Sequence, residues 1–242
     1  MTTTVQDIAI ITGAGSGVGR SVAYSLAQRG VHVVLIDRDE PMVRETADVI
    51  ASEGGKADLH VADMASRDSV DTLLKALLEQ YSSVMMLVHS AGFINLANLQ
   101  DADINDLDLH YRVNVWAPYY ITQKLLPNII SCQGQIVFMN SSMGVGTKMG
   151  ASQYAATKHA LRAMADTLRL EVNEQGVRVT SVFPGKIATP MQQKIAISSG
   201  IPYNPTAMLQ VEDVSSTIVH ALYLPRSAEI TDIHIRPMNK SL

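Results

Sequence analysis

Cysteine is almost absent from this sequence, since Cys132 is the only one among 242 residues. A single cysteine allows neither an intrachain disulfide nor a cysteine-rich metal site, and it fits a reducing compartment. We expect no metal and interpret Cys132 as a small buried residue. Runs of lysine and arginine are also missing, and the formal net charge is -4. This argues against a nucleic-acid partner. A small molecule is the partner that we expect.

Long apolar stretches are missing as well. No segment approaches the roughly 20 apolar residues that span a bilayer, and the N-terminal MTTTVQDIAIITG lacks the basic region and apolar core of a signal peptide. We therefore expect a cytoplasmic protein without a membrane partner. The sequence does contain many apolar residues, 47% against 17% charged. That is enough for one folded domain over residues 1–242.

Short β-branched runs alternate with longer segments of helical period, which is the pattern of βαβ units and a parallel sheet. Strands covered on both faces are expected at 8–11, 31–36, 59–61, 84–88, 136–139 and 177–182, and a seventh at 230–235 on a sheet edge. Helices are expected at 17–29, 41–52, 66–80, 104–130, 152–175 and 211–222. The predicted fold class is α/β, a single Rossmann-type doubly wound parallel sheet of about seven strands with helices on both faces.

A glycine-rich loop joins the first expected strand to the first expected helix. Its sequence is TGAGSGVG, starting at Thr12. Glycines let a backbone approach a pyrophosphate, and a helix N-terminus offers free N–H groups and a favourable dipole. The loop residues predicted to bind a dinucleotide are Gly13, Gly15, Ser16, Gly17, Val18 and Gly19. The Walker pattern GxxxxGK[ST] is absent, so a triphosphate site is not indicated.

Asp37 ends the second expected strand, twenty residues after Gly17. A carboxylate there can accept hydrogen bonds from the adenosine ribose hydroxyls and would repel a 2′-phosphate. The neighbouring Arg38 is able to pair with such a phosphate, although a solvated surface charge is an equally good interpretation of it. We expect NAD(H) as the favoured cofactor, with NADP(H) left open.

Tyr154 and Lys158 lie four residues apart in the expected helix 152–175, and hence on one helical face. A nearby cation favours the phenolate and brings the group closer to proton exchange near neutral pH. Alone, such a pair is usually a surface feature. Here it follows the glycine loop, and Ser141 precedes Tyr154 by thirteen residues.

The ordered motifs resemble the classical short-chain dehydrogenase/reductase family from residue 8 to about 236. Those that match are TGAGSGVG, Asp37, Asp63, Asn114 in RVNVW, Ser141, Tyr154 with Lys158, and Phe183-Pro184-Gly185 with Thr189. The resemblance implies a cofactor half over residues 1–100 and a catalytic and substrate half over 101–242. Within the second half, the SSG and the prolines of the segment at about 190–205 suggest a mobile lid. It also implies hydride transfer between a secondary alcohol and a ketone or aldehyde.

Four catalytic roles follow from the resemblance. Tyr154 would be the general acid/base, and Ser141 would hydrogen-bond the reacting oxygen. Lys158 would bind the nicotinamide ribose and lower the tyrosine pKa, and Asn114 would hold a water that links Lys158 to solvent. Ser142 is the rival of Ser141, which we prefer for its spacing to Tyr154 and because Gly144 follows it by three residues.

The resemblance also extends the cofactor site beyond the glycine loop. Asp63 would contact the adenine, and Ile187 and Thr189 would meet the nicotinamide carboxamide. Tyr154 and Lys158 belong to this site too. The remaining cofactor-binding residues are Arg38, Met64, Ala91, Gly92, Pro184 and Gly185.

One motif departs from the family pattern, because His89-Ser90-Ala91-Gly92 stands where NNAG is usual. Ala91 and Gly92 still allow a close backbone approach. His89 is read as a structural residue rather than as a second acid/base. The departure keeps open an alternative, a catalytically inactive relative that binds NAD or serves as a scaffold. Another Rossmann enzyme, such as a methyltransferase, fits the TGxxxGxG spacing and the YxxxK pair poorly.

The sequence says less about the substrate side of the site than about the cofactor side. Apolar residues should line it, which suggests an uncharged or amphipathic ketone or alcohol; they are Phe93, Ile94, Met143, Met149, Met191 and Tyr203. Lys186 is either a ligand for a substrate acid group or a solvated lysine at the rim. The helices around Asn114 and Tyr154 commonly pair between subunits in this family, so we expect a homodimer or homotetramer.

Overall fold

The computed structural model describes residues 7–238 and contains one sheet of seven parallel strands in the order β3-β2-β1-β4-β5-β6-β7. The strands are β1 (Ile8–Thr12), β2 (His32–Asp37), β3 (Lys56–Val61), β4 (Met86–His89), β5 (Gln135–Met139), β6 (Arg178–Pro184) and β7 (Asp232–Ile235). The order reverses beside β1, whose neighbours are β2 and β4. This is the place where a doubly wound sheet opens a crevice at the carboxyl ends of its strands.

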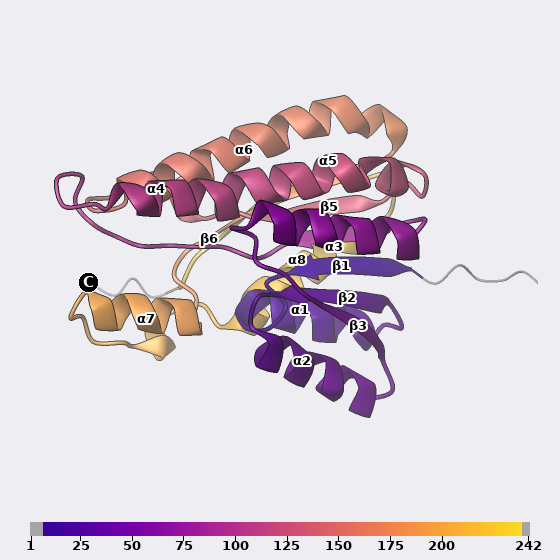
Figure 1. Cartoon of the computed structure of the whole chain (residues 1–242), viewed down its shortest axis with the longest axis horizontal. Helices are drawn as coiled ribbons and strands as arrows, with labels where there is room; N and C mark the ends of the chain where they lie inside the picture. Colours follow the sequence, from indigo (N-terminus) through magenta and orange to yellow (C-terminus); the bar gives the residue numbers. More distant parts are fainter. Residues whose placement is uncertain (1–6, 239–242) are drawn as a thin grey trace, which may run out of the picture.

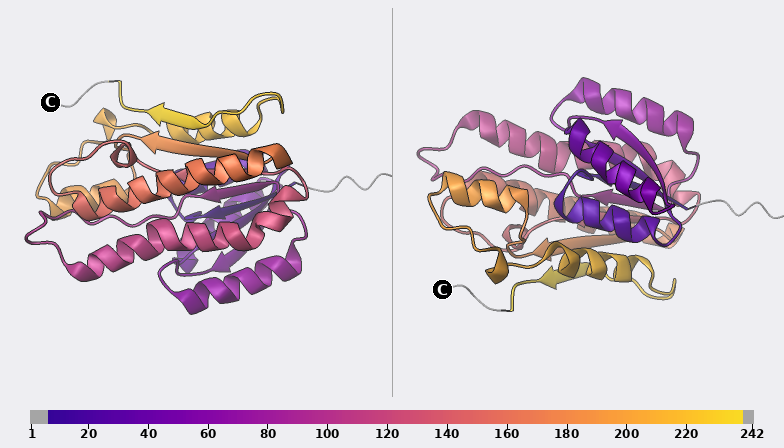
Figure 2. Two further views of the ribbon diagram at one scale, coloured as in Figure 1. Left: turned by 90° about the horizontal axis from the view of Figure 1, so that it is seen from above. Right: turned by 90° about the horizontal axis from the view of Figure 1, so that it is seen from below.

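Helices cover both faces of the sheet (Figure 1). The α-helices are α1 (Gly17–Ala27), α2 (Glu40–Ser52), α3 (Arg67–Gln80), α4 (Ile104–Tyr111), α5 (Ala117–Ile130), α6 (Ser152–Val172), α7 (Pro190–Ser198) and α8 (Val211–Leu222). Figure 2 shows α3, α5 and α6 on one face and α1, α2 and α8 on the other. The predicted fold class is thereby confirmed.

Two buried apolar clusters, one on each side of the sheet, form the core. Alternating side chains of β1 divide between them: Ile11 packs with α1 and α8, and Ile10 packs with α3, α5 and α6. Strands filled in this way are apolar at almost every position, because both faces are covered. The carboxyl ends of these strands are left to form the site.

Three elements differ from the expectations. The strand beginning at Lys56 is longer than predicted and lies on the sheet edge, so β3 is only half-buried and is not covered on both faces. The expected helix 104–130 is interrupted by a π-helical turn, Arg112–Trp116, between α4 and α5. The segment at 190–205, expected as a lid, contains the helix α7, which begins with Thr189 as N-cap and Pro190 in its first turn.

Candidate active site

The glycine loop between β1 and α1 is so tightly folded that larger residues do not fit. Gly13 has a φ of 69°, and a Cβ atom added there would lie 2.7 Å from the backbone nitrogen of Ala91. A Cβ on Gly19 would lie 2.2 Å from the Gly13 carbonyl oxygen. The glycines therefore let the loop, α1 and the end of β4 approach one another closely. Open backbone at a helix N-terminus is the arrangement that a pyrophosphate needs.

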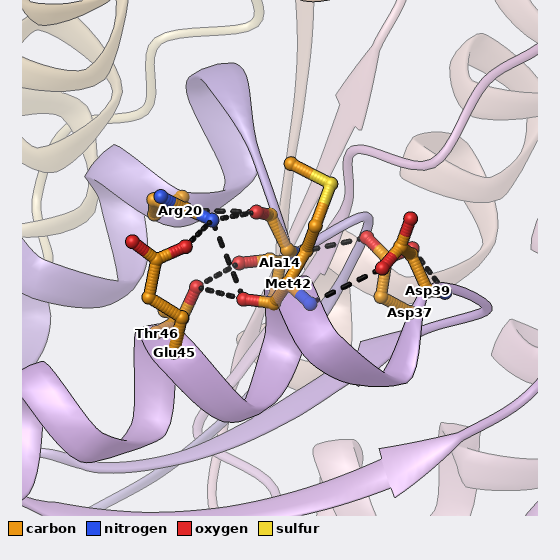
Figure 3. Close-up of polar contacts among 8 residues, drawn as sticks. Ala14, Arg20, Asp37, Asp39, Met42, Glu45 and Thr46 are labelled. Atoms are coloured by element: carbon orange, nitrogen blue, oxygen red, sulfur yellow. Dashed lines mark hydrogen bonds and ion pairs between the residues drawn. The ribbon is translucent and has the colours of Figure 1, made fainter.

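Side chains from helices α1 and α2 hold this loop through its carbonyl groups (Figure 3). Arg20 donates from Nε to the Gly15 carbonyl oxygen at 2.8 Å and also forms an ion pair with Glu45 at 3.1 Å. The buried Thr46 donates from Oγ1 to the Ala14 carbonyl at 3.1 Å. Side chains of α1 and α2 thus hold two carbonyl groups of the loop.

Asp37 lies against the same loop at the end of β2. Its Oδ2 accepts a hydrogen bond from the Gly15 N–H at 2.9 Å, and its Oδ1 accepts one from the Asp39 N–H at 3.1 Å. A carboxylate has about four acceptor positions, so ribose hydroxyls can still bind to it. Arg38 is exposed beside it.

The predicted adenine contacts follow the edge strand β3. The Asp63 N–H donates to Ser69 Oγ at 2.9 Å, and the Asp63 Oδ1 accepts from the Ala65 N–H at 2.9 Å. Met64 is buried in the core on the side of α3. These bonds fix the backbone of the turn after β3 next to the turn that carries Asp37.

The departure from NNAG has a structural explanation. His89 is buried, its Nε2 lies 2.9 Å from Thr122 Oγ1, and its ring stacks on Phe138 with 5.1 Å between centroids. Burial lowers the pKa of His89 to about 3, so the ring is neutral at any working pH. The N–H groups of Ser90 and Ala91 both donate to Thr12 Oγ1 at 3.2 Å. The structure favours the structural role for His89.

Tyr154 lies in the first turn of α6, where it meets Ser141 from the loop after β5. Burial raises the pKa of Tyr154 to about 12, and a hydrogen bond with the Ser141 side chain acts in the opposite direction. The pKa thus lies above the usual value of a phenol, and not below it as expected from the neighbouring Lys158. The Ser141 Oγ also accepts from the Met143 N–H at 3.1 Å, which places the serine at the start of a short 3-10 turn. The structure brings Ser141 to Tyr154, as the spacing predicted.

Lys158 follows Tyr154 by one helical turn and is only 4% exposed. Its Nζ lies 5.8 Å from the centre of the Tyr154 ring and donates to the Met139 carbonyl oxygen at 2.7 Å. Burial lowers the pKa of Lys158 to about 8. The ammonium carries three N–H donors and has one acceptor among residues 7–238. Two donors therefore remain for ribose hydroxyls, so the residues present fit a bound nicotinamide nucleotide.

Asn114 lies in the π-helical turn and is 1% exposed. Its side-chain amide forms two hydrogen bonds with the backbone of Phe93. It accepts one from the N–H and donates one to the carbonyl oxygen, each at 2.9 Å. It also donates to Thr157 Oγ1 at 3.2 Å, one residue before Lys158. π-Helical turns are frequent at functional sites. In this structure Asn114 joins the loop after β4 to α6, while the water relay expected of it stays a prediction.

His110 is a neighbour of the site that the sequence reasoning missed. Its Nε2 accepts a hydrogen bond from the Asn95 N–H at 3.0 Å, and its ring centroid lies 6.1 Å from that of Tyr154. Burial lowers the pKa of His110. The signal available in the sequence was its spacing, because His110 precedes Asn114 by four residues and therefore shares its helical face.

The loop after β6 completes the site. The Gly185 N–H, after Pro184, donates to the Ile235 carbonyl at 2.8 Å, and Ile187 pairs with Leu209 in an isolated parallel bridge. Thr189 reaches the glycine loop, since its Cγ2 lies 3.3 Å from the Cβ position of Gly17. The two predicted cofactor-binding loops, after β1 and after β6, thus meet at Gly17 and Thr189.

Residues 7–238 contain no group of three or more His, Cys, Asp and Glu side chains that could hold a metal ion. No helix within the same range has both the length and the apolar character to cross a membrane.

Comparison with known proteins points to one family. The model of the short chain dehydrogenase family matches residues 7–199. An uncharacterized oxidoreductase of Staphylococcus epidermidis is 28% identical over 234 residues, which cover 96% of this chain and 98% of the relative. Among solved structures, an alcohol dehydrogenase of Thermococcus sibiricus complexed with 5-hydroxy-NADP has a TM-score of 0.87 at 22% identity, over 98% of this chain and 99% of that one. A putative NAD(P)-dependent gluconate 5-dehydrogenase of Beutenbergia cavernae has a TM-score of 0.83 at 26% identity, covering 94% of each chain.

Proposed function

This chain belongs to the short-chain dehydrogenase family of oxidoreductases, and from that premise we propose that it interconverts a secondary alcohol and a ketone or aldehyde with a nicotinamide cofactor. The observation that carries the proposal is the contact of Tyr154 with both Ser141 and Lys158. A phenol can donate a proton to a reacting carbonyl oxygen, a hydroxyl can donate a hydrogen bond to it, and a nearby cation stabilises the negative charge that develops.

The chemistry of reduction follows from the state of these groups. The nicotinamide cofactor, when bound in its reduced form, would supply the hydride for the carbonyl carbon. The Tyr154 hydroxyl donates its proton to the carbonyl oxygen, and the Ser141 hydroxyl donates a hydrogen bond to the same oxygen. The pKa of Tyr154, about 12, keeps the phenol protonated at neutral pH, ready to act as the acid. The Lys158 ammonium stabilises the phenolate that remains, and oxidation runs through the same groups in reverse.

Asp37 favours NAD(H) over NADP(H) in this proposal. Its carboxylate is held against Gly15 where adenosine ribose hydroxyls would approach, and a 2′-phosphate there meets like charge. NADP(H) stays open for two reasons: Arg38 is exposed next to Asp37, and the similar structure from Beutenbergia cavernae has NADP bound. Parallel assays with NADH and NADPH decide between the two cofactors.

We also propose that the chain forms a homodimer or homotetramer. Large apolar side chains on α4 and α5 are exposed in a single copy, and pairing between copies would bury them; they are Ile104, Leu107, Tyr111 and Tyr119. A monomeric mass by light scattering at micromolar concentration contradicts this assembly.

The experiment that tests the proposed reaction is the Tyr154→Phe variant, assayed on a panel of ketones, aldehydes and secondary alcohols. We expect turnover to fall by at least about a thousandfold because the acid is lost, while binding of NADH, followed by its fluorescence, persists. Tyr223→Phe, at an exposed position outside the surface proposed to pair, is the matched control and should keep full activity. Equal turnover by Tyr154→Phe and the wild type overturns the mechanism. A wild type that binds NADH and reduces nothing favours the inactive relative instead.

A further inference from the structure

The two loops that follow β5 and β6 are basic, although the protein as a whole is acidic. Residues 140–153 and 184–211 contain three lysines, Lys148, Lys186 and Lys194, and no aspartate or glutamate, whereas the whole chain has a formal net charge of -4. β5 and β6 are adjacent parallel strands, so both loops leave the same edge of the sheet. The first of these loops begins at Asn140 and Ser141 and leads directly into Tyr154.

The backbones that carry Lys148 and Lys186 are fixed in place. The Ala151 N–H donates to the Lys148 carbonyl at 3.2 Å, and the Ala97 N–H donates to the adjacent Gly150 carbonyl at 3.0 Å. The Leu209 N–H donates to the Lys186 carbonyl at 2.9 Å. The two lysines therefore start from defined positions, while their long side chains stay free to adapt to a ligand.

Lys148 and Lys186 carry like charges on two loops that leave adjacent strands at the same edge of the sheet. Burial lowers the pKa of Lys148, and the positive charge of Lys186 lowers it further. Neither lysine forms an ion pair with a residue in the range 7–238, although many other surface cations of the chain do, including Arg44 and Arg112. Both side chains are exposed, so water screens much of the repulsion between them. An anion bound by both lysines would supply the counter-ion that no residue in the range 7–238 provides.

We propose that the substrate of this site carries an oxyanion, a carboxylate or a phosphate, which is bound by Lys148 and Lys186 while its carbonyl group faces Tyr154. The inference rests on the proposed oxidoreductase function and adds the class of substrate. It changes the expectation of an uncharged ketone, which came from the apolar residues of the same region. Those residues, such as Phe93 and Met143, remain available for the carbon skeleton of an anionic substrate.

The test compares substrates that differ only in charge. A series of keto acids is assayed beside their methyl esters and beside keto phosphates of equal length, with the preferred cofactor in excess. We expect the wild type to have a higher kcat/KM for one class of anion than for the ester. Lys148→Met and Lys186→Met should each lower kcat/KM for that anion roughly tenfold, the loss typical of one charge-assisted hydrogen bond, and leave the ester unchanged. Whether acid or phosphate is the better substrate identifies the oxyanion.

Lys124→Met, at an exposed position of α5, is the matched control because it removes the same charge away from the site. It should leave kcat/KM unchanged for both the anion and the ester. Thermal melting checks that all variants fold. A wild type that prefers the ester, or lysine variants with an unchanged anion-to-ester ratio, overturns the inference and leaves the proposed reaction standing. A wild type that reduces no carbonyl compound with either cofactor overturns both together.

Discussion

The loop after β1 and the segment after β6 lie at the same edge of the sheet but are held in different ways. The first is bonded to residues distant in the sequence, such as Asp37 and Thr46. The second, residues 187–207, forms its hydrogen bonds with described residues only inside the stretch 186–210. Its helix α7 has a single buried residue, Ala196. In Figure 1 α7 lies apart from the other helices, at one end of the molecule.

This difference shows how one fold divides two tasks. A cofactor always presents the same pyrophosphate and ribose groups, so a site fixed before binding avoids the cost of ordering the loop. A substrate segment with few outside bonds can change its sequence and position without disturbing the core. The two regions touch at Gly17 and Thr189, where the nicotinamide is expected.

The largest effect is expected in the glycine loop, which is the more firmly held of the two regions. In Gly19→Ala the new Cβ would meet the Gly13 carbonyl oxygen at 2.2 Å, a backbone atom that cannot move alone. Cofactor affinity by titration calorimetry should fall by at least about a hundredfold, roughly 3 kcal/mol. Gly54→Ala is the control: it also strains the backbone, at a φ of 81°, but meets no atom within 4 Å. It should cost about 1 kcal/mol of stability and keep cofactor affinity. Normal affinity in Gly19→Ala would mean that the loop adapts after all.

Lys158 gives the next effect, on the free energy of unfolding. Its pKa is lowered from 10.5 to about 8, so the unfolded chain binds the proton more tightly, and wild-type stability should rise as the pH increases from 8 to 10.5. Lys158→Met lacks this dependence and should be more stable than the wild type at pH 7 by about 1 to 3 kcal/mol, while losing activity. Urea unfolding at pH 7, 9 and 10 measures the gap, which should shrink with pH. Lys124→Met is the control, and an equal pH slope in Lys158→Met would contradict the assigned burial cost.

A variant of Arg20 tests whether the side-chain bonds that hold the glycine loop contribute to cofactor binding. Arg20→Met removes the donor to Gly15 and the ion pair with Glu45. We expect KM for the cofactor to rise about tenfold, or 1.4 kcal/mol, with kcat unchanged, because Tyr154 and Ser141 are not touched. Arg44→Met, which removes an exposed pair with Glu40 on α2, should leave both constants as they are. A lower kcat at constant KM would place Arg20 in another role.

The sequence predicted well those features that depend on local spacing. Strand and helix periods recovered the sheet, and the family resemblance pointed to Ser141, which the structure places beside Tyr154. α7 was missed even though its start carries a clear signal, Thr189 followed by Pro190, because the SSG and the prolines further along suggested an irregular lid.

Contacts between distant residues were beyond such reasoning. In the sequence, Arg20 and Thr46 look like ordinary helix residues. They reach their distant partners, Glu45 and Ala14, only because the turn after β2 brings α2 next to the glycine loop. The partner of His89, Thr122, is likewise 33 positions away and comes from α5. Tertiary packing alone decides which polar residues of an amphipathic helix acquire such roles.

The smallest effect is expected in α7, where it measures how loosely the substrate segment is attached. Ile197 is 72% exposed, so Ile197→Ala should change the free energy of unfolding by less than about 0.5 kcal/mol. The identical substitution at the fully buried Ile11 of β1 should cost about 2 to 5 kcal/mol, since it leaves a cavity. Denaturant titration of both variants gives the contrast directly. A similar cost at the two positions would show that α7 packs against the body of the protein or against another copy in solution, and the substrate segment would then be as firmly held as the glycine loop.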